Sequence, residues 1–286
     1  IMNISKKQNN NKTLKFIENF LVYALLVIIA AVIILPILWI ILSSLQKGTS
    51  LYSSTFIPTT FTFEHYKTLF TSTDYPIWYK NTLKIAFLNM IIGVLITTLT
   101  AYTFSRYRFK GRKNIMMGML VLQMFPSFLS MTAIVVLITK LNLMDTVWGL
   151  VLVYAAGQIP YNAWLIKGYF DGIPKSLDEA ARIDGAGHLT IFWKIIMPLA
   201  KPILVLVALT NFTGPWFDFI FPKILLRSRE TKTLAVGIFE WVQGRADNNF
   251  TLFAAGSILI AIPIFILFGV LQRHIVAGLT QGGVKD

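Results

Sequence analysis

The residue types that most often carry chemistry are sparse in this sequence and widely separated. Its 286 residues contain no cysteine, which excludes a thiol nucleophile and a disulfide framework. The three histidines, His65, His188 and His274, lie in separate segments without the spacing of metal ligands. No Gly-x-x-x-x-Gly-Lys-Ser/Thr pattern for binding nucleotide phosphates occurs. We therefore expect no catalytic residue, no metal and no cofactor on this chain.

A few polar side chains stand inside otherwise apolar stretches. Asn89, Asn211 and Asp218 are the clearest, and Trp216 lies two residues before Asp218. Polar groups at membrane depth line substrate or ion paths, or they hydrogen-bond across helices. We predict these four residues as candidates to line a pore or contact a substrate, with helix packing as the alternative.

The segment 173–198 has the pattern of two short helices joined by a sharp turn. Ser176 and Glu179 match a capping box, which predicts a helix over 177–184. Gly185 is suited to end this helix, because glycine accepts the positive φ found after a helix C-terminus. Apolar residues at 189, 192, 193 and 196 share one face of a second helix, predicted over 188–197. Such a pair could pass force from a docked protein to the membrane.

The same segment resembles the signature loop of permease subunits of ATP-binding-cassette (ABC) importers. That loop reads Glu-Ala-Ala, three residues, Gly, nine residues, Ile, one residue, Leu-Pro. The matching residues here are Glu179, Ala180, Ala181, Gly185, Ile195 and Pro198. Met197 replaces the usual leucine, an apolar change of similar volume. Segments 164–170, 233–237 and 278–285 further resemble the shorter permease subunit of maltose/maltodextrin importers.

The resemblance implies a type I importer permease fold with an ATPase-docking site on this loop. The docking residues would be the matching positions together with Asp184, and the tail residues Gly282, Gly283 and Lys285 would reach the ATPase interface. The implied partners are a homologous second permease subunit, two copies of a cytoplasmic ATPase carrying ATP and Mg²⁺, and an extracytoplasmic sugar-binding protein. The implied cargo is an oligosaccharide of the maltodextrin type.

The composition places the elements that position this loop in a membrane. Hydrophobic residues make up 55% of the chain and charged residues only 14%, whereas soluble domains carry about 25% charged residues. Apolar blocks near the length of about 20 residues that crosses a bilayer occur six times. These blocks cover 17–43, 83–104, 115–138, 147–167, 202–225 and 251–272. The sequence therefore predicts an all-α, multi-pass protein of the cell membrane, surrounded by lipid.

The distribution of basic residues predicts the orientation. With the N-terminus in the cytoplasm, 16 of the 26 Lys and Arg residues fall on inside segments and 10 on outside segments. The densest cluster, at 106–113, lies in a short inside loop, where the positive-inside rule has most force. Both termini are therefore predicted to be cytoplasmic. The net charge of +13 has the same origin and does not indicate nucleic-acid binding, because no basic soluble domain is present.

The sequence predicts a cytoplasmic segment over 1–16, a six-span permease domain over 17–273 with a coupling loop at 171–201, and a cytoplasmic tail over 274–286. The predicted function is a pore-forming permease subunit of an ABC sugar importer, with ATP hydrolysis left to its partners. The alternative is an ion-coupled secondary transporter, for which Asp218 is the clearest acidic candidate inside a span. A passive channel is a third class. Neither alternative needs a docking loop.

Overall fold

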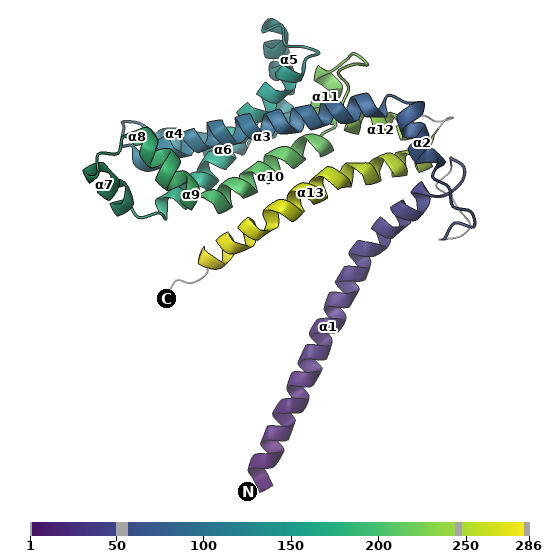
Figure 1. Ribbon diagram of the computed structural model, residues 1–286, viewed down its shortest axis with the longest axis horizontal. Coiled ribbons are helices and arrows are strands. Elements are labelled where there is room, and N and C mark those ends of the chain that lie inside the picture. Colours follow the sequence, from purple (N-terminus) through teal and green to yellow (C-terminus); the bar gives the residue numbers. More distant parts are fainter. Residues whose placement is uncertain (1, 50–56, 244–247, 283–286) are drawn as a thin grey trace.

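The computed structural model describes residues 2–49, 57–243 and 248–282 of the chain. Within these ranges the elements are helices, and the one β-type pairing is an isolated bridge between Gln46 and Phe61. Figure 1 shows an elongated helical bundle from which one long helix diverges. The predicted all-α fold is confirmed.

Within the described residues, three helices are long and apolar enough to cross a membrane by themselves. They lie in α1 (Met2–Ser44), α3 (Tyr75–Arg106) and α13 (Phe250–Gly282), with membrane-compatible parts at Ile17–Ser44, Tyr75–Arg106 and Phe250–Arg273. The 32 residues of α3 extend over about 48 Å. That length exceeds the hydrocarbon core of a bilayer, about 30 Å. These helices match the first, second and sixth predicted spans.

The fourth predicted span is one helix, whereas the fifth is broken. Helix α6 (Val147–Asp171) continues through Pro160. Helix α10 (Lys201–Phe217) ends soon after Pro215, and α11 (Ile220–Leu225) follows. The segment before α10, His188–Leu199, meets it at a bend of 80°. The stretch predicted as the fifth span, 202–225, is therefore divided, because the chain leaves the helix at Asp218, where ψ is 123°.

The third predicted span, over 115–138, is also broken. It consists of α4 (Arg112–Gln123), a short 3₁₀ helix η1 (Ser127–Ser130) and α5 (Met131–Lys140). Pro126 lies in the gap, and proline both lacks a donor N–H and disfavours helical geometry in the residue before it. The stretch predicted as the third span is therefore divided into two helices at this proline. Figure 1 shows α5 projecting away from the rest of the bundle.

Helix α3 is the central element, packed along α6 and α10, while α13 covers α10. One buried cluster lies toward the end that carries the 173–198 loop and includes Tyr102, Phe170 and Phe192. A second cluster, with Tyr75 and Trp216, joins α3 and α10 to α12 (Leu234–Gln243). Helix α2 (Glu64–Thr71) packs on α13 and α3 nearby. The bundle is therefore fixed by an apolar core toward each end.

Helix α1 is the exception to this packing. It contacts α13, but 0% of its most apolar 18-residue window is buried within the chain. In Figure 1 it leaves the bundle at the α2 end and runs away from it. Its apolar sides are therefore available to lipid or to another subunit.

Candidate functional site

The segment that resembles the signature loop forms a compact pair of helices at one end of the bundle. It consists of α7 (Ser176–Ile183), α8 (His188–Ile191), a π-helical turn η2 (Phe192–Ile196) and α9 (Met197–Leu199). Figure 1 places α7 and α8 at the extreme end, beside the tips of α3, α4 and α6. The two predicted helices are confirmed within a residue or two of their expected limits.

The start of α7 differs from the prediction. Lys175 is the N-cap and already has near-helical dihedrals, φ −68° and ψ −21°. Ser176 is consequently the first helical residue, and no side chain caps this end. The backbone N–H of Glu179 donates instead to the carbonyl of Lys175 at 3.1 Å. The predicted capping box was wrong, because it requires Ser176 to be the N-cap, whereas Lys175 holds that position and the helix begins one residue earlier.

The end of α7 is as predicted. Gly185 has a φ of +81°, the left-handed region that a C′ glycine supplies without strain. Its N–H donates to the carbonyl of Arg182 at 3.0 Å, and the N–H of Ala186 donates to the carbonyl of Ala181 at 2.9 Å. These two bonds form a Schellman motif. A Cβ on Gly185 would meet nothing within 4 Å, so the site requires glycine for its conformation and not for space.

Most predicted docking residues lie on the outer surface of this pair of helices. Those exposed are Glu179, Ala180, Asp184, Gly185 and Pro198, whereas Ala181 is buried and Ile195 is half-buried. Two apolar side chains outside the predicted set, Ile183 and Leu189, are 87% and 74% exposed on either side of the turn. Exposed apolar groups together with a charged residue suit a protein–protein contact.

Arg106, at the last turn of α3, attaches α7 to the bundle. Its Nε lies 2.7 Å from Oδ2 of Asp178, and these side chains are only 4% and 8% exposed. Its two other guanidinium nitrogens donate to the carbonyls of Phe170, at 3.0 Å, and Ile173, at 3.2 Å. One arginine therefore joins α3, the end of α6 and α7. Sequence reasoning missed this role, because Arg106 belongs to a cluster explained by the positive-inside rule alone.

Three candidate pore residues are buried between helices of this chain. Asn89, Asn211 and Trp216 are 0%, 1% and 1% exposed. Pro215 has no N–H to give the carbonyl of Asn211, four residues earlier, and Nδ2 of Asn89 donates to that carbonyl at 2.6 Å. Nδ2 of Asn162 donates to Oδ1 of Asn211 at 3.0 Å. These contacts support the packing alternative, and a pore role for these residues stays a prediction.

Asp218 is the candidate that borders a cavity. The cavity is about 330 Å³ in volume and is also lined by Tyr154, Gln158 and Pro215. The hydroxyl of Tyr154 donates to Oδ2 of Asp218 at 2.7 Å, and the N–H of Ile220 donates to Oδ1 at 2.9 Å. The carboxylate thus holds the break between α10 and α11, and its position beside a pore stays a prediction.

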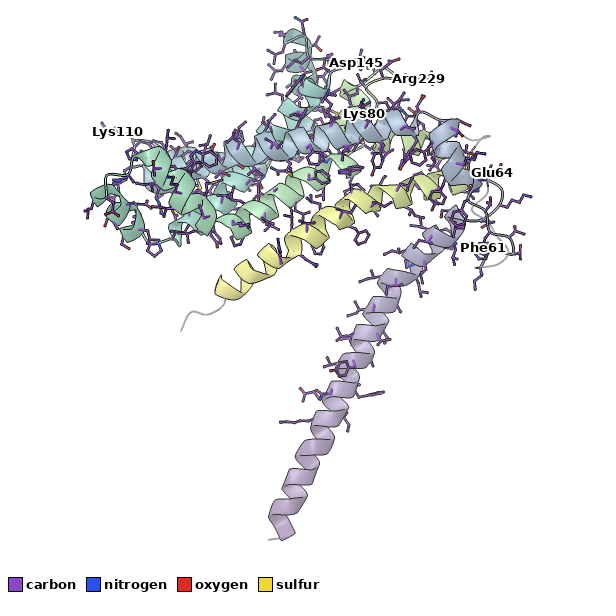
Figure 2. The ribbon with its side chains drawn as sticks, viewed as in Figure 1. Phe61, Glu64, Lys80, Lys110, Asp145 and Arg229 are labelled. Carbon is purple, nitrogen blue, oxygen red and sulfur yellow. The ribbon has the colours of Figure 1, made fainter. Side chains whose placement is uncertain are left out.

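Toward the α2 and α12 side of the bundle, carboxylates hold the loop 226–233, which joins α11 to α12. Asp145 accepts hydrogen bonds from the N–H groups of Arg227, at 2.7 Å, and Ser228, at 3.0 Å, and from the hydroxyl of Thr231. Partial burial raises the pKa of Asp145, but these bonds outweigh it and lower the pKa to about 2. Arg229 pairs with Asp74. Figure 2 shows Asp145 and Arg229 far from Lys110, which marks the α7 end.

The remaining predicted site residues belong to the C-terminal tail. Gly282 is the last residue of α13, whereas Gly283 and Lys285 lie outside the described residues. Figure 1 shows α13 running from the α2 end toward the α7 end. Among the side chains that the structure describes, no three Asp, Glu or His residues gather as metal ligands would.

The geometry agrees with comparisons to known proteins. Residues 89–281 match the family model described as "Binding-protein-dependent transport system inner membrane component". The galactooligosaccharide permease GanQ and the maltodextrin permease MdxG of Bacillus subtilis are each 44% identical to this chain, covering 96% of it and 98% and 99% of themselves. The maltose/maltodextrin permease MalG of Escherichia coli K12 is 34% identical, over 93% of this chain and 95% of MalG.

Solved structures agree with the sequence relatives. A chain of a bacterial ABC transporter involved in the import of the acidic polysaccharide alginate superposes with a TM-score of 0.79 at 25% identity, covering 90% of this chain and 96% of that one. A chain of the MetNI methionine ABC transporter, at 17% identity and a TM-score of 0.51, shares the fold. The family model covers well over half of the sequence, and the chain therefore belongs to the family of binding-protein-dependent transport system inner membrane components.

Proposed function

We propose that this chain forms one half of the translocation pore of an ABC importer for oligosaccharides, with α7–α9 as the surface that contacts the ATPase. The observation that carries the proposal is the architecture of α7. Its outer face is exposed, while Arg106 ties its inner face to α3 and α6 through buried contacts. A force applied to α7 would therefore reach two membrane helices directly.

The docking surface combines charge with apolar area. Glu179 and Asp184 are exposed acidic groups on α7 and its cap, and a basic group on the ATPase would complement them. Ile183 and Leu189 flank the turn and would fill apolar pockets on the partner. Gly185 adds no side chain and lets a partner backbone approach. The tail residues Gly282, Gly283 and Lys285 are proposed to reach the same ATPase, since α13 runs toward this end.

The proposed cargo class follows from the names of the relatives. GanQ, MdxG and MalG are named for galactooligosaccharides, maltodextrin and maltose/maltodextrin. An oligosaccharide of the maltodextrin type is the first candidate, and a galactooligosaccharide is the second at equal identity. No relative supports the ion-coupled alternative, and Asp218 is already engaged by Tyr154 and Ile220.

The proposed assembly contains a second permease subunit, two ATPase subunits carrying ATP and Mg²⁺, and an external sugar-binding protein. The bare apolar surface of α1 supports the second permease, because a helix that diverges from its own bundle leaves room for a foreign one. The loop held by Asp145 and Asp74 offers the binding protein a fixed surface. This chain itself would contribute no catalytic group.

The experiment is co-purification of ATPase activity with the tagged chain in mild detergent. Ile183→Glu places a charge in the proposed apolar contact without disturbing the bundle, because Ile183 is 87% exposed. We expect the recovered ATPase activity to fall by about tenfold or more. Glu179→Lys, which reverses the complementary charge, should have the same effect.

The matched control is Phe61→Glu, which changes an apolar side chain of 58% exposure at the opposite end of the bundle from α7. It should retain the ATPase. Equal losses of ATPase activity in Ile183→Glu and Phe61→Glu would contradict the proposal that α7–α9 is the docking site. A chain that purifies alone and transports without ATP would instead support the alternative of an ion-coupled secondary transporter.

A further inference from the structure

A basic cavity lies beside the docking loop but belongs to a different part of the chain. It has a volume of about 620 Å³, is partly open to the surroundings, and is lined by the 108–113 segment, the start of α4 and the last turns of α6. Four basic residues line it: Arg108, Arg112, Lys113 and Lys167. None of its lining residues is acidic. The cavity therefore concentrates positive charge around a space large enough for a polar group.

Little within the chain neutralises this charge. Lys167 pairs with Asp171, and the same carboxylate lies within electrostatic range of Arg112. Arg108 and Lys113 have no acidic partner among the described residues. One negative charge thus faces four positive charges. Like charges held together favour the uptake of an anion, because each cation lowers the free energy of a negative ligand.

The backbone contributes in the same direction. Helix α4 begins after Gly111, whose φ is +86°, and no side chain caps its N-terminus. Its first turn carries Arg112 and Lys113 and no acidic residue. Basic groups are unfavourable at the positive end of a helix dipole, where anions are stabilised. An anion in the cavity would offset both the uncapped N–H groups and these basic side chains.

The other side of the cavity is apolar. Phe109, Met116, Met117 and Trp164 complete its lining. The indole Nε1 of Trp164 donates to the carbonyl of Met116 at 3.0 Å, which fixes the ring, and Nζ of Lys167 lies 6.0 Å from the ring centre. A free phosphate ion would gain nothing from the apolar side chains on this side of the cavity. A lipid that joins a phosphate to a glycerol and acyl chains would contact both sides of the cavity.

We infer that this cavity binds the phosphate of an anionic phospholipid in the leaflet on the α7 side of the membrane. Basic pockets between transmembrane helices are suited to such headgroups. Arg108 and Lys113 would contact the phosphate, Lys167 would approach it from α6, and Trp164 would pack against the glycerol region. Because Arg106 lies two residues before Arg108, the bound lipid would sit next to the side chain that holds α7.

The test is native mass spectrometry of the purified full chain, titrated with phosphatidylglycerol or with phosphatidylcholine of the same acyl chains. We expect tighter binding of phosphatidylglycerol. Arg108→Gln and Lys113→Gln should each weaken it by about fivefold, the usual value of one basic residue near an anionic headgroup. The matched control is Lys110→Gln, because Lys110 is an exposed residue of the same segment that does not line the cavity. It should change the affinity by less than twofold.

Three results would overturn the inference. Equal affinity for the two lipids would show that the charge of the headgroup does not matter. Equal effects of Arg108→Gln and Lys110→Gln would place the lipid outside the cavity. Inorganic phosphate that binds to the detergent-solubilised chain as tightly as phosphatidylglycerol would assign the site to a free anion. None of these readouts depends on an ATPase or a sugar, so they stand apart from tests of the proposed function.

Discussion

Arg106 is a case in which the position of one charge decides its role. It lies in a run with Arg108 and Arg112, and all three satisfy the positive-inside rule equally well. Only Arg106 points into the bundle, where it replaces its water shell with Asp178 and two carbonyl groups. A buried ion pair gains little over apolar packing, but a partner left alone is strongly unfavourable. The pair is therefore better explained as a device that fixes the position of α7 than as a source of stability.

This explanation predicts the behaviour of Arg106→Met and Asp178→Leu. Each single change leaves one buried charge without a partner and should cost about 3–5 kcal/mol of unfolding free energy. The double variant should cost clearly less than the sum, measured as a double-mutant cycle on the purified chain. The double variant should nevertheless retain less ATPase than wild type, because α7 loses its fixed position. Additive single effects would show that the two side chains do not act together.

At the scale of elements, α7 depends on its end more than on its beginning. The start lacks a side-chain cap, whereas the Schellman motif at Gly185 satisfies two carbonyls of the last turn. A non-glycine residue in the left-handed region costs about 1–2 kcal/mol. The turn that separates α7 from α8 is therefore set by one backbone conformation.

The matched pair Gly185→Ala and Gly187→Ala tests this point. A Cβ would meet nothing within 4 Å at either position, but only Gly185 has a positive φ. Gly185→Ala should speed hydrogen exchange of the backbone amides at positions 185 and 186 by about tenfold. This factor is equivalent to roughly 1.4 kcal/mol. Gly187→Ala should leave exchange within twofold of wild type. Equal exchange in the two variants would mean that conformation at Gly185 does not hold the turn.

Helix α10 illustrates how a neighbouring helix compensates a proline. The carbonyl of Asn211 has lost its donor at Pro215, and Asn89 on α3 supplies one. Asn89→Leu should therefore cost about 1–2 kcal/mol, the sum of a lost interhelical bond and an unpaired carbonyl.

In a Pro215→Ala background the helix provides its own N–H, and the cost of Asn89→Leu should fall by at least half. Asn162→Leu is the control, because Asn162 bonds to the side chain of Asn211 and its cost should not depend on residue 215. Thermal unfolding of the five variants in detergent gives the comparison. An Asn89→Leu cost that is the same in both backgrounds would contradict the account.

The elements that sequence reasoning found are those fixed by local rules. The apolar blocks predict the spans, and Gly185 predicts the end of α7, because both depend on residues close in the chain. Pro126, Pro160 and Pro215 all lie inside predicted spans, but the sequence does not show which of them interrupts its helix, since a proline in a membrane helix can be either accommodated, as Pro160 is, or disruptive. The contacts of Arg106 and Asn89 cross more than 60 residues and leave no local pattern.

At the scale of the whole molecule, the two ends of the bundle differ in character. One end carries α7, the basic cavity and Lys110, and the other side carries α2 with Glu64 and Phe61 (Figure 2). Docking of a cytoplasmic ATPase requires the first end to face the cytoplasm. The surplus of Lys and Arg on the predicted inside segments, 16 against 10, favours the same orientation.

The absence of cysteine from all 286 residues permits a direct test of this orientation, because an introduced thiol is unique. Glu64→Cys and Lys110→Cys both replace exposed charged residues. A membrane-impermeant maleimide should label Glu64→Cys in intact cells and label Lys110→Cys only after the membrane is permeabilised. The opposite result would place α7 outside the cell, where no cytoplasmic ATPase can reach it. In that case the docking proposal would fail even though the fold and the family assignment would stand.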